Sequence, residues 1–251
     1  MRVGTLLAAF LLIVSSLIAQ DSEEWMRGPD GGTTYHVDGI SVRSLPGQPF
    51  SGRSTTEWTR TLEDGSVVTT HLFAMVARDS QGRIYREGRN FVPVNSNQEP
   101  RRYRFQIFDP VTHTWTLCMV ATHSCNVSNY FASTAFTLRP VGPFDDGKRT
   151  LSRQSLGNDV MDGINVVGTQ ETVTINAGVM GNSQAFSITR EFWYSPELQV
   201  NLGITRKDPR EGKQVVRVHE VSRSEPDQNL FKVPEGYAVH DLRNNTPKAA
   251  N

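Results

Sequence analysis

Apolar residues recur at every second position along most of the chain from about Ser51 onward, and short polar segments separate the alternating runs. Because successive side chains of a β-strand point to opposite faces, a period of two predicts strands that bury one face. A helical period is confined to residues 126–138, where Ser, Thr and Asn weaken it and only one short helix is expected. The pattern therefore predicts a mainly β protein with at most one or two short helices.

Turn signals separate the predicted strands. Asp64-Gly65 lies between residues 53–62 and 67–78, and Asp-Gly suits the positive φ angles of a tight hairpin. Residues 79–82 then reverse the chain into a strand over 83–92, with Gly82 at the position that favours a left-handed conformation. The same device recurs at residues 109–110, 162–163 and 208–212. The chain is thus predicted to be a succession of antiparallel hairpins, with residues 139–143 (RPVGP) as the boundary between two halves of the sheet.

The most regular apolar stripe lies near the C-terminus. Its members are expected to share one face of each of two consecutive strands, and they are Phe186, Ile188, Phe192 and Tyr194, followed by Leu198, Val200, Leu202 and Ile204. Val216 and Val218 continue the stripe on a third strand. Such an apolar layer must be buried against a second sheet, a helix or a ligand.

The N-terminal residues predict export. Residues 1–19 combine one Arg with a nearly unbroken apolar run that ends in small residues, which is typical of a cleaved signal peptide. The Gly- and Pro-rich residues 20–49 form a leader, either lying on the domain or acting as a flexible tether. Residues 50–240 are expected to form a single antiparallel β domain, and residues 241–251 a disordered tail. We expect a periplasmic or extracellular protein without a transmembrane span after cleavage.

Charge and composition narrow the function classes. The chain carries 26 basic and 26 acidic residues, so no overall field recruits nucleic acid. A hydrophobic content of 37% suits a sheet with one wet face better than a helical bundle. No cofactor motif is present in the sequence, and we expect no cofactor.

Two cysteines are the clearest covalent candidates. Cys118 and Cys125 flank a short polar loop, and a hairpin centred near residues 121–122 brings them opposite each other. In an exported protein a disulfide is the default interpretation. His113 and His123 lie nearby, but the spacing matches no zinc pattern, so no metal site is expected.

Catalytic patterns are weak. Residues 181–185 (GNSQA) imitate the nucleophile elbow of esterases around Ser183, but a predicted strand follows where the elbow requires a helix. These residues are better explained as a turn. No carboxylate pair can be assigned as acid and base from the sequence alone. Whether the protein is an enzyme is left open, and the absence of a convincing motif argues against it.

Three phrases carry a resemblance to a known group of proteins. Residues 194–198 (YSPEL), 78–83 (RDSQGR) and 230–234 (LFKVP) resemble those of a family of uncharacterised exported bacterial proteins, over roughly residues 51–237. Pro226 before the last phrase suits a short helical turn that places Leu230 and Phe231 under the sheet. More distantly, the chain is similar to the outer-membrane lipoprotein carrier and its periplasmic sensor relatives. That resemblance implies a strongly curved sheet or open half-barrel that holds acyl chains on its concave side.

The resemblance and the apolar stripe together suggest a binding surface. The apolar ligand-binding residues are expected to be Phe186, Ile188, Phe192, Leu198, Val200 and Leu202. Arginines are frequent over residues 78–104, and Arg83, Arg86 and Arg102 are the candidates for a basic rim, although a solvated sheet face explains the cluster as well. The leading hypothesis is a non-catalytic cell-envelope protein that binds an apolar or amphipathic ligand, such as a lipid or lipoprotein acyl chain. The alternatives are a structural or protein-interaction domain with an envelope protein partner and, third, a secreted hydrolase.

Overall fold

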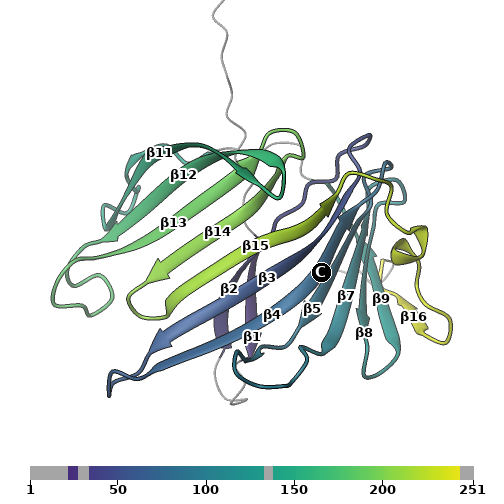
Figure 1. Cartoon of the computed structure of the whole chain (residues 1–251), viewed down its shortest axis with the longest axis horizontal. Helices are drawn as coiled ribbons and strands as arrows, with labels where there is room; N and C mark the ends of the chain where they lie inside the picture. Colours follow the sequence, from purple (N-terminus) through teal and green to yellow (C-terminus); the bar gives the residue numbers. More distant parts are fainter. Residues whose placement is uncertain (1–21, 28–33, 133–137, 244–251) are drawn as a thin grey trace, which may run out of the picture.

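A computed structural model describes the backbone of residues 22–27, 34–132 and 138–243, and the side chains within these ranges from residue 39 onward (Figure 1). The predicted signal peptide and residues 244–251 of the predicted tail lie outside the described residues. Two N-terminal strands, β1 (Ser22–Arg27) and β2 (Thr34–Gly39), pair with each other as a separate hairpin.

Within these ranges, fourteen strands form one sheet built from two consecutive meanders. The strands of the first meander are β3 (Phe50–Thr61), β4 (Val67–Arg78), β5 (Ile84–Arg89), the short β6 (Val92–Pro93), β7 (Arg102–Asp109), β8 (Thr114–Met119) and β9 (Ser124–Asn129). Those of the second are β10 (Gly142–Pro143), β11 (Arg149–Met161), β12 (Ile164–Ile175), β13 (Phe186–Ser195), β14 (Val200–Asp208) and β15 (Gly212–Ser222). Antiparallel pairing of β15 with β3 joins the two meanders into one sheet.

The chain ends on the outer edge of the first meander. A 3₁₀ turn, η1 (Gln228–Phe231), precedes β16 (Ala238–Asp241), which pairs in parallel with β9. The two edges of the sheet are therefore β10 and β16, and residues 139–143 lie on the connection that runs from one meander to the other. The predicted helical turn after Pro226 is present, with Asp227 as its N-cap.

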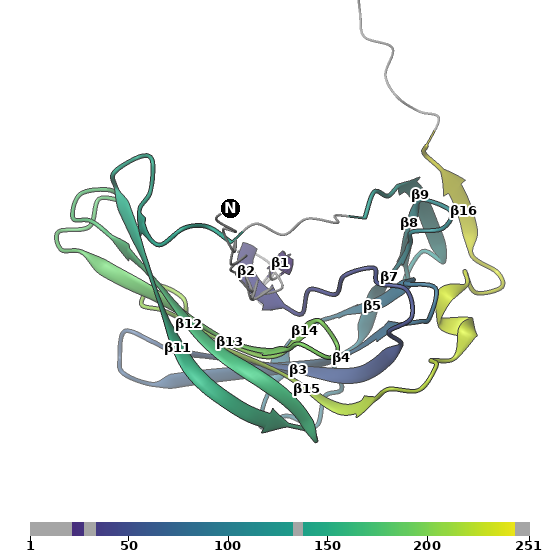
Figure 2. The same cartoon turned by 90° about the horizontal axis from the view of Figure 1, so that it is seen from above.

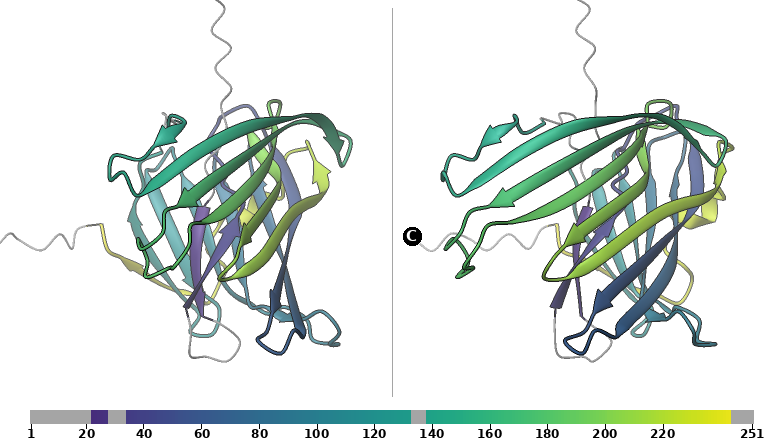
Figure 3. Two further views of the ribbon diagram at one scale, coloured as in Figure 1. Left: turned by 90° about the vertical axis from the view of Figure 1, so that its left-hand side faces the viewer. Right: turned by 60° about the vertical axis from the view of Figure 1, so that its left-hand side comes forward.

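The sheet is strongly curved and open. Figure 2 shows the β1–β2 hairpin inside the curve and η1 outside it, and the two views of Figure 3 show the same arrangement. The predicted antiparallel, strongly curved β architecture is confirmed. The helix expected within residues 126–138 is wrong for residues 126–129, which belong to β9, because Val127 and its neighbours pair with β8. Residues 133–137 of that segment lie outside the described part.

The concave face is partly covered by the chain itself. Ile40 and Phe50 are buried in a core cluster with Val76, Val216 and Ile204, and Val42 forms a β-bridge to Val200. The part of the predicted leader from residue 39 onward therefore lies on the domain, the first of the two alternatives.

The convex face carries a second core under the C-terminal segment. Cys118 and Cys125 are directly opposite in the β8–β9 hairpin and form the predicted disulfide. Both are fully buried, beside Phe105 and the η1 residue Phe231. The C-terminal segment is thus the cover of this face, and the disulfide lies beneath it.

Strand β14 is buried on both faces. Leu202 and Ile204 are inaccessible to solvent. The polar residues Asn201, before Leu202, and Thr205, after Ile204, are buried as well. A register shift opposite Trp193 and Tyr194 interrupts the strict alternation that the sequence predicts from Leu198 to Ile204. The end of this strand therefore packs into the core instead of presenting one open apolar face.

Candidate functional site

A groove of about 720 Å³ lies on the concave side of the second meander. Strands β12, β13 and β14 contribute residues to it, and the β10–β11, β12–β13 and β14–β15 loops contribute further residues from one end of the sheet. Its lining consists of Arg139, Phe144, Asp146, Arg149, Glu171, Val173, Ile175, Val179, Met180, Ile188, Arg190, Arg206 and Arg210. This volume lies within the range of about 300–1,000 Å³ that is typical of small-molecule sites.

The floor of the groove has an apolar part. Val173 is directly opposite Ile188 across the β12–β13 pair, and Ile175 is opposite Phe186. Directly opposite residues share a face, so these four side chains form one patch. Ile188, Val173 and Phe186 are only partly buried, and Met180 at the groove's end is 58% exposed. Apolar surface is therefore accessible on this part of the concave face.

A row of charged residues crosses the same floor two positions further along the strands. Glu171 on β12 is opposite Arg190 on β13, and Arg190 is opposite Arg206 on β14. Arg206 is 4% exposed and forms ion pairs with Asp208 and Glu211, at 2.8 and 2.5 Å. The groove thus combines apolar side chains with a charged row, and Arg210 also lies against Phe186.

The carboxylate of Asp208 binds two arginines of the groove, Arg206 and Arg210. Its carboxylate accepts hydrogen bonds from Arg206 Nη2 at 2.8 Å and from Arg210 Nε and Nη2 at 2.9 and 2.7 Å. Burial opposes the ionised form, but the hydrogen bonds from Arg210 and the charges of Arg210 and Arg206 hold the pKa of Asp208 below its ordinary value. The hydrogen bond to Asp208 in turn raises the pKa of Arg210. These charges persist at neutral pH.

One hydrogen-bond donor of Arg206 lacks a partner in the described part of the chain. Arg206 Nε is buried and makes no hydrogen bond there, although both Nη atoms of the same guanidinium do. An unsatisfied buried donor costs free energy unless a water molecule or a ligand accepts its hydrogen bond.

The apolar residues predicted from the sequence divide into two groups. Ile188 lines the groove, and the ring of Phe186 lies 5.2 Å from the Arg210 guanidinium. The other four, Phe192, Leu198, Val200 and Leu202, are buried in the core cluster that includes Ile40. They are in contact with the protein's own side chains, and a ligand role for them stays a prediction.

The three predicted rim arginines each contact different residues of the protein itself. Arg83 binds Asp79 in the β4–β5 turn, and Arg86 lines a small cavity beneath Ile40 where burial lowers the pKa of its guanidinium. Arg102 donates to Tyr85 Oη at 2.9 Å and to Glu87 at 3.2 Å. Burial and the neighbouring Glu87 raise the pKa of Tyr85 to about 12. A ligand-binding role for these three arginines as a basic rim therefore stays a prediction.

Two arginines of the groove, Arg190 and Arg206, occupy positions of the apolar stripe but were not predicted as site residues. Arg190 interrupts the alternation between Ile188 and Phe192, and Arg206 follows Ile204 at the same spacing. A charged residue at an apolar position on each of two paired strands marks a charged row on the buried face. The sequence alone does not show that Arg190 and Arg206 are directly opposite each other, because this depends on the pairing register of β13 and β14.

Residues of the three phrases that carry the resemblance contact one another: Arg78 contacts Leu198, and Arg83 lies over the ring of Phe231. We call residues 78–83, 194–198 and 225–231 the junction. Arg78 is fully buried and donates to the carbonyl oxygens of Arg43, Gln48 and Leu198 at 3.0, 2.8 and 2.7 Å. Ser195 Oγ accepts from the amide of Leu198.

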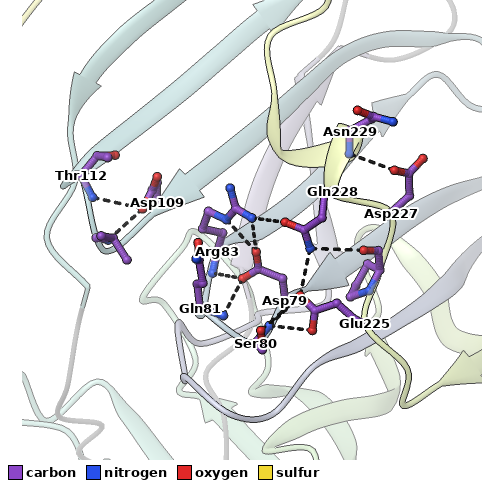
Figure 4. Close-up of polar contacts among 12 residues, drawn as sticks. Asp79, Ser80, Gln81, Arg83, Asp109, Thr112, Glu225, Asp227, Gln228 and Asn229 are labelled. Atoms are coloured by element: carbon purple, nitrogen blue, oxygen red, sulfur yellow. Dashed lines mark hydrogen bonds and ion pairs between the residues drawn. The ribbon is translucent and has the colours of Figure 1, made fainter.

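The C-terminal side of the junction is drawn in Figure 4. Asp79 accepts from the amides of Gln81 and Arg83 and from Arg83 Nε, at 3.0, 2.8 and 2.6 Å (Figure 4). Glu225 accepts from the Ser80 amide, and Gln228 accepts from Arg83. The junction therefore holds the N-terminal segment, the β13–β14 turn and the C-terminal segment to the β4–β5 turn. Its role is structural.

The remaining chemical candidates stay outside the groove. Ser183 lies in the β12–β13 loop with a strand after it, as expected for a turn. Among the residues whose positions are described, no group of three or more His, Cys, Asp or Glu is placed to hold a metal ion. No helix in those residues has the length and apolarity needed to span a membrane.

Several solved structures are similar to this chain. The Pseudomonas aeruginosa MucA/MucB complex matches at 12% identity and a TM-score of 0.36, over 74% of this chain and 56% of that chain. The Mycobacterium tuberculosis lipoprotein LppX matches at 13% identity and a TM-score of 0.26, over 72% and 90%. A LolA superfamily protein from Nitrosomonas europaea matches at 11% identity and a TM-score of 0.27, over 76% and 99%.

These matches agree with the expected distant resemblance to the lipoprotein carrier fold. The chain spans little more than half the length of the MucB chain that it matches. No known protein family and no curated protein matches the sequence.

Proposed function

We propose that this is a non-catalytic, exported cell-envelope protein that binds an apolar or amphipathic ligand, such as the acyl chain of a lipid or lipoprotein, in the concave groove. The observation that carries the proposal is the partly exposed apolar pair of Val173 and Ile188 in a groove of about 720 Å³, with the partly exposed Phe186 beside it. Export rests on the apolar run of residues 1–19.

The binding energy comes from burial of the chain. Each methylene removed from water contributes about 0.8 kcal/mol, so a medium-length acyl chain over this patch supplies useful affinity. The groove needs no rearrangement of the core, because Phe192, Leu198, Val200 and Leu202 remain packed against Ile40. The proposed ligand-binding residues are therefore Val173, Phe186 and Ile188.

Native mass spectrometry of the protein purified from a bacterial periplasm, before and after organic extraction, tests the proposal. We expect a bound mass in the lipid range that extraction removes, and direct binding of the uncharged amphiphile dodecyl maltoside in calorimetry. The variant Ile188→Asp places a charge on the apolar patch and should abolish both signals.

Thr189→Asp is the matched control, because Thr189 is the next residue of β13 and points to the opposite face. Circular dichroism establishes that both variants fold, and Ile188→Ala replaces the aspartate variant if it does not. A clean apoprotein mass together with no binding of dodecyl maltoside would instead favour a packed protein-interaction domain.

A further inference from the structure

Most of the outer edge of β11 has no strand partner among the described residues. The strand has 13 residues, and β10 pairs with only Thr150 and Leu151. Figure 3 shows β11 along the margin of the sheet. Residues 157–160, toward the end of the strand, are exposed. An open strand edge presents backbone N–H and C=O groups on which another chain can pair.

The hairpin geometry shows which backbone groups face this edge. Asp162 and Gly163 form the two-residue turn between β11 and β12, with φ angles of 50° and 75°, as in a type I′ turn. Met161 next to this turn directs its backbone hydrogen bonds to β12, so Asn158 and Val160 direct theirs away from β12. In agreement, the Val160 amide donates to Asp159 Oδ1 at 2.8 Å.

The open edge carries few of the features that prevent strand addition. Residues 149–161 contain neither Lys nor Pro, which commonly protect edge strands. One register shift bends the strand between Ser155 and Gly157, and residues 157–161 beyond it pair with β12 in an uninterrupted register. A stretch of regular strand is therefore available for pairing.

The side chains along this stretch indicate the chemistry of a partner. Val160 and Val167 are 59% and 39% exposed and are diagonal neighbours on one face of the β11–β12 pair. Asp159 lies on the alternate face, is exposed, and has no ion-pair partner in the described part of the chain. An added strand would therefore place apolar residues beside the valines and basic residues beside Asp159.

A second copy of this chain fits the edge less well. If Asn158 and Val160 paired antiparallel with Val160 and Asn158 of a copy, each Asp159 would face the same carboxylate of the other chain. Like charges directly opposite each other destabilise a strand pair. The edge therefore favours a segment of different sequence.

We propose that the outer edge of β11 binds an extended segment of another protein by strand addition. Alternate residues of the segment are apolar and pack beside Val160, and the residues between them are basic and lie beside Asp159. Main-chain hydrogen bonds supply affinity in this binding mode, and alternate side chains supply specificity. The inference concerns a different surface from the concave groove and does not depend on the ligand of that groove.

Binding of the peptide acetyl-VKVKVKV-amide to the full chain tests the proposal. We expect saturable binding by fluorescence anisotropy of a labelled peptide, with amide shifts in nuclear magnetic resonance at residues 157–161. N-methylation of the valines removes the donors that pair with β11 and should weaken binding at least about tenfold. N-methylation of the lysines removes only outward-facing donors and should leave the affinity unchanged.

Charge reversal at the edge tests the side-chain preference. Asp159→Lys places a positive charge beside the lysines of the peptide and should weaken binding at least about threefold at low salt. Glu63→Lys is the matched control, because Glu63 is exposed in the β3–β4 turn and the net charge changes equally. Circular dichroism establishes that both variants fold, and Asp159→Asn replaces the lysine variant if it does not.

Each contrary result overturns a stated part of the proposal. Absence of saturable binding, equal effects of the two N-methylations, or shifts at β16 instead of residues 157–161 overturn strand addition at β11. Unchanged affinity in Asp159→Lys, or an equal loss in Glu63→Lys, overturns the preference for basic residues. A dimer of the full chain in sedimentation velocity that the peptide dissociates would assign the edge to a second copy instead.

Discussion

The junction and the groove use the same residue types and differ in how completely their polar groups are satisfied. In the junction, Arg78 is fully buried and each of its three hydrogen bonds ends on a carbonyl oxygen of a different segment. In the groove, Arg206 is nearly as buried, but one donor has no partner in the described residues and partly exposed apolar side chains adjoin it. A completed polar network stabilises a fold, whereas an incomplete one beside accessible apolar surface is suited to a ligand.

The comparison of the junction with the groove also shows where the three phrases behind the sequence resemblance lie. Arg78 contacts Leu198, and Arg83 lies over the ring of Phe231, so each phrase contributes to the junction. Arg190, Arg206 and Val173 of the groove lie outside the phrases. A protein that shares these phrases therefore shares the scaffold, and its ligand depends on other residues.

The largest expected effect is that of removing the central carboxylate of the groove. Asp208→Asn leaves Arg206 with Glu211 as its remaining ion-pair partner in the described residues, and loss of one member of a buried pair costs roughly 3–5 kcal/mol of unfolding free energy. Urea denaturation followed by circular dichroism measures it. Asp146→Asn, which affects the more exposed pair with Arg149, should have a much smaller effect on the free energy of unfolding. Equal effects of the two substitutions would contradict the buried role of Asp208.

The pH dependence of stability sharpens that result. Because the folded-state pKa of Asp208 is lowered, its contribution is present above the unfolded value of about 3.9 and is lost as the pH falls through the folded value. The difference in stability between the wild type and Asp208→Asn should therefore shrink below about pH 4. A difference that stays constant throughout acid unfolding would show that the lowered pKa does not contribute.

A smaller loss is expected in the junction. Arg78→Lys keeps the charge, but one ammonium group cannot reproduce the planar fork that reaches three separate carbonyl oxygens. We expect a loss of about 2–3 kcal/mol in the free energy of unfolding, from one or two unsatisfied buried groups. Arg101→Lys on the exposed surface should stay within about 0.5 kcal/mol. At temperatures where Arg78→Lys is folded, the affinity of this variant for dodecyl maltoside should equal that of the wild type.

The smallest effect is expected at the exposed end of the junction. Glu225→Gln weakens the acceptor of the Ser80 amide, and for an exposed carboxylate the cost should be at most about 1 kcal/mol. Amide hydrogen exchange should be faster at Ser80 and unchanged in the β8–β9 hairpin. Glu235→Gln, a similarly exposed substitution, should leave exchange at Ser80 unaffected. Uniformly faster exchange would indicate global destabilisation instead of a local opening.

Local pattern predicted much of the scaffold and little of the site. The alternation over residues 67–78 corresponds to the whole of β4, and the loop between Cys118 and Cys125 placed the disulfide correctly. The helical spacing around Val127 was misleading, because pairing with β8 outweighs a weak local preference. Arg190 and Arg206 were visible as interruptions of an apolar stripe, but their opposition depends on a register that a β-bulge shifts.

The sequence by itself determined the strands, their turns and the cysteine pair, because a period of two and a turn residue act over a few neighbouring positions. Only the tertiary structure decided which apolar stripe stays accessible. Residues from Ile40 onward cover the middle of the concave face, over β14 of the second meander as well as β4 of the first, and contacts such as Arg78 to Leu198 join positions 120 residues apart. A stripe packed against its own chain and a stripe left for a ligand have the same alternation, so the difference lies in long-range packing.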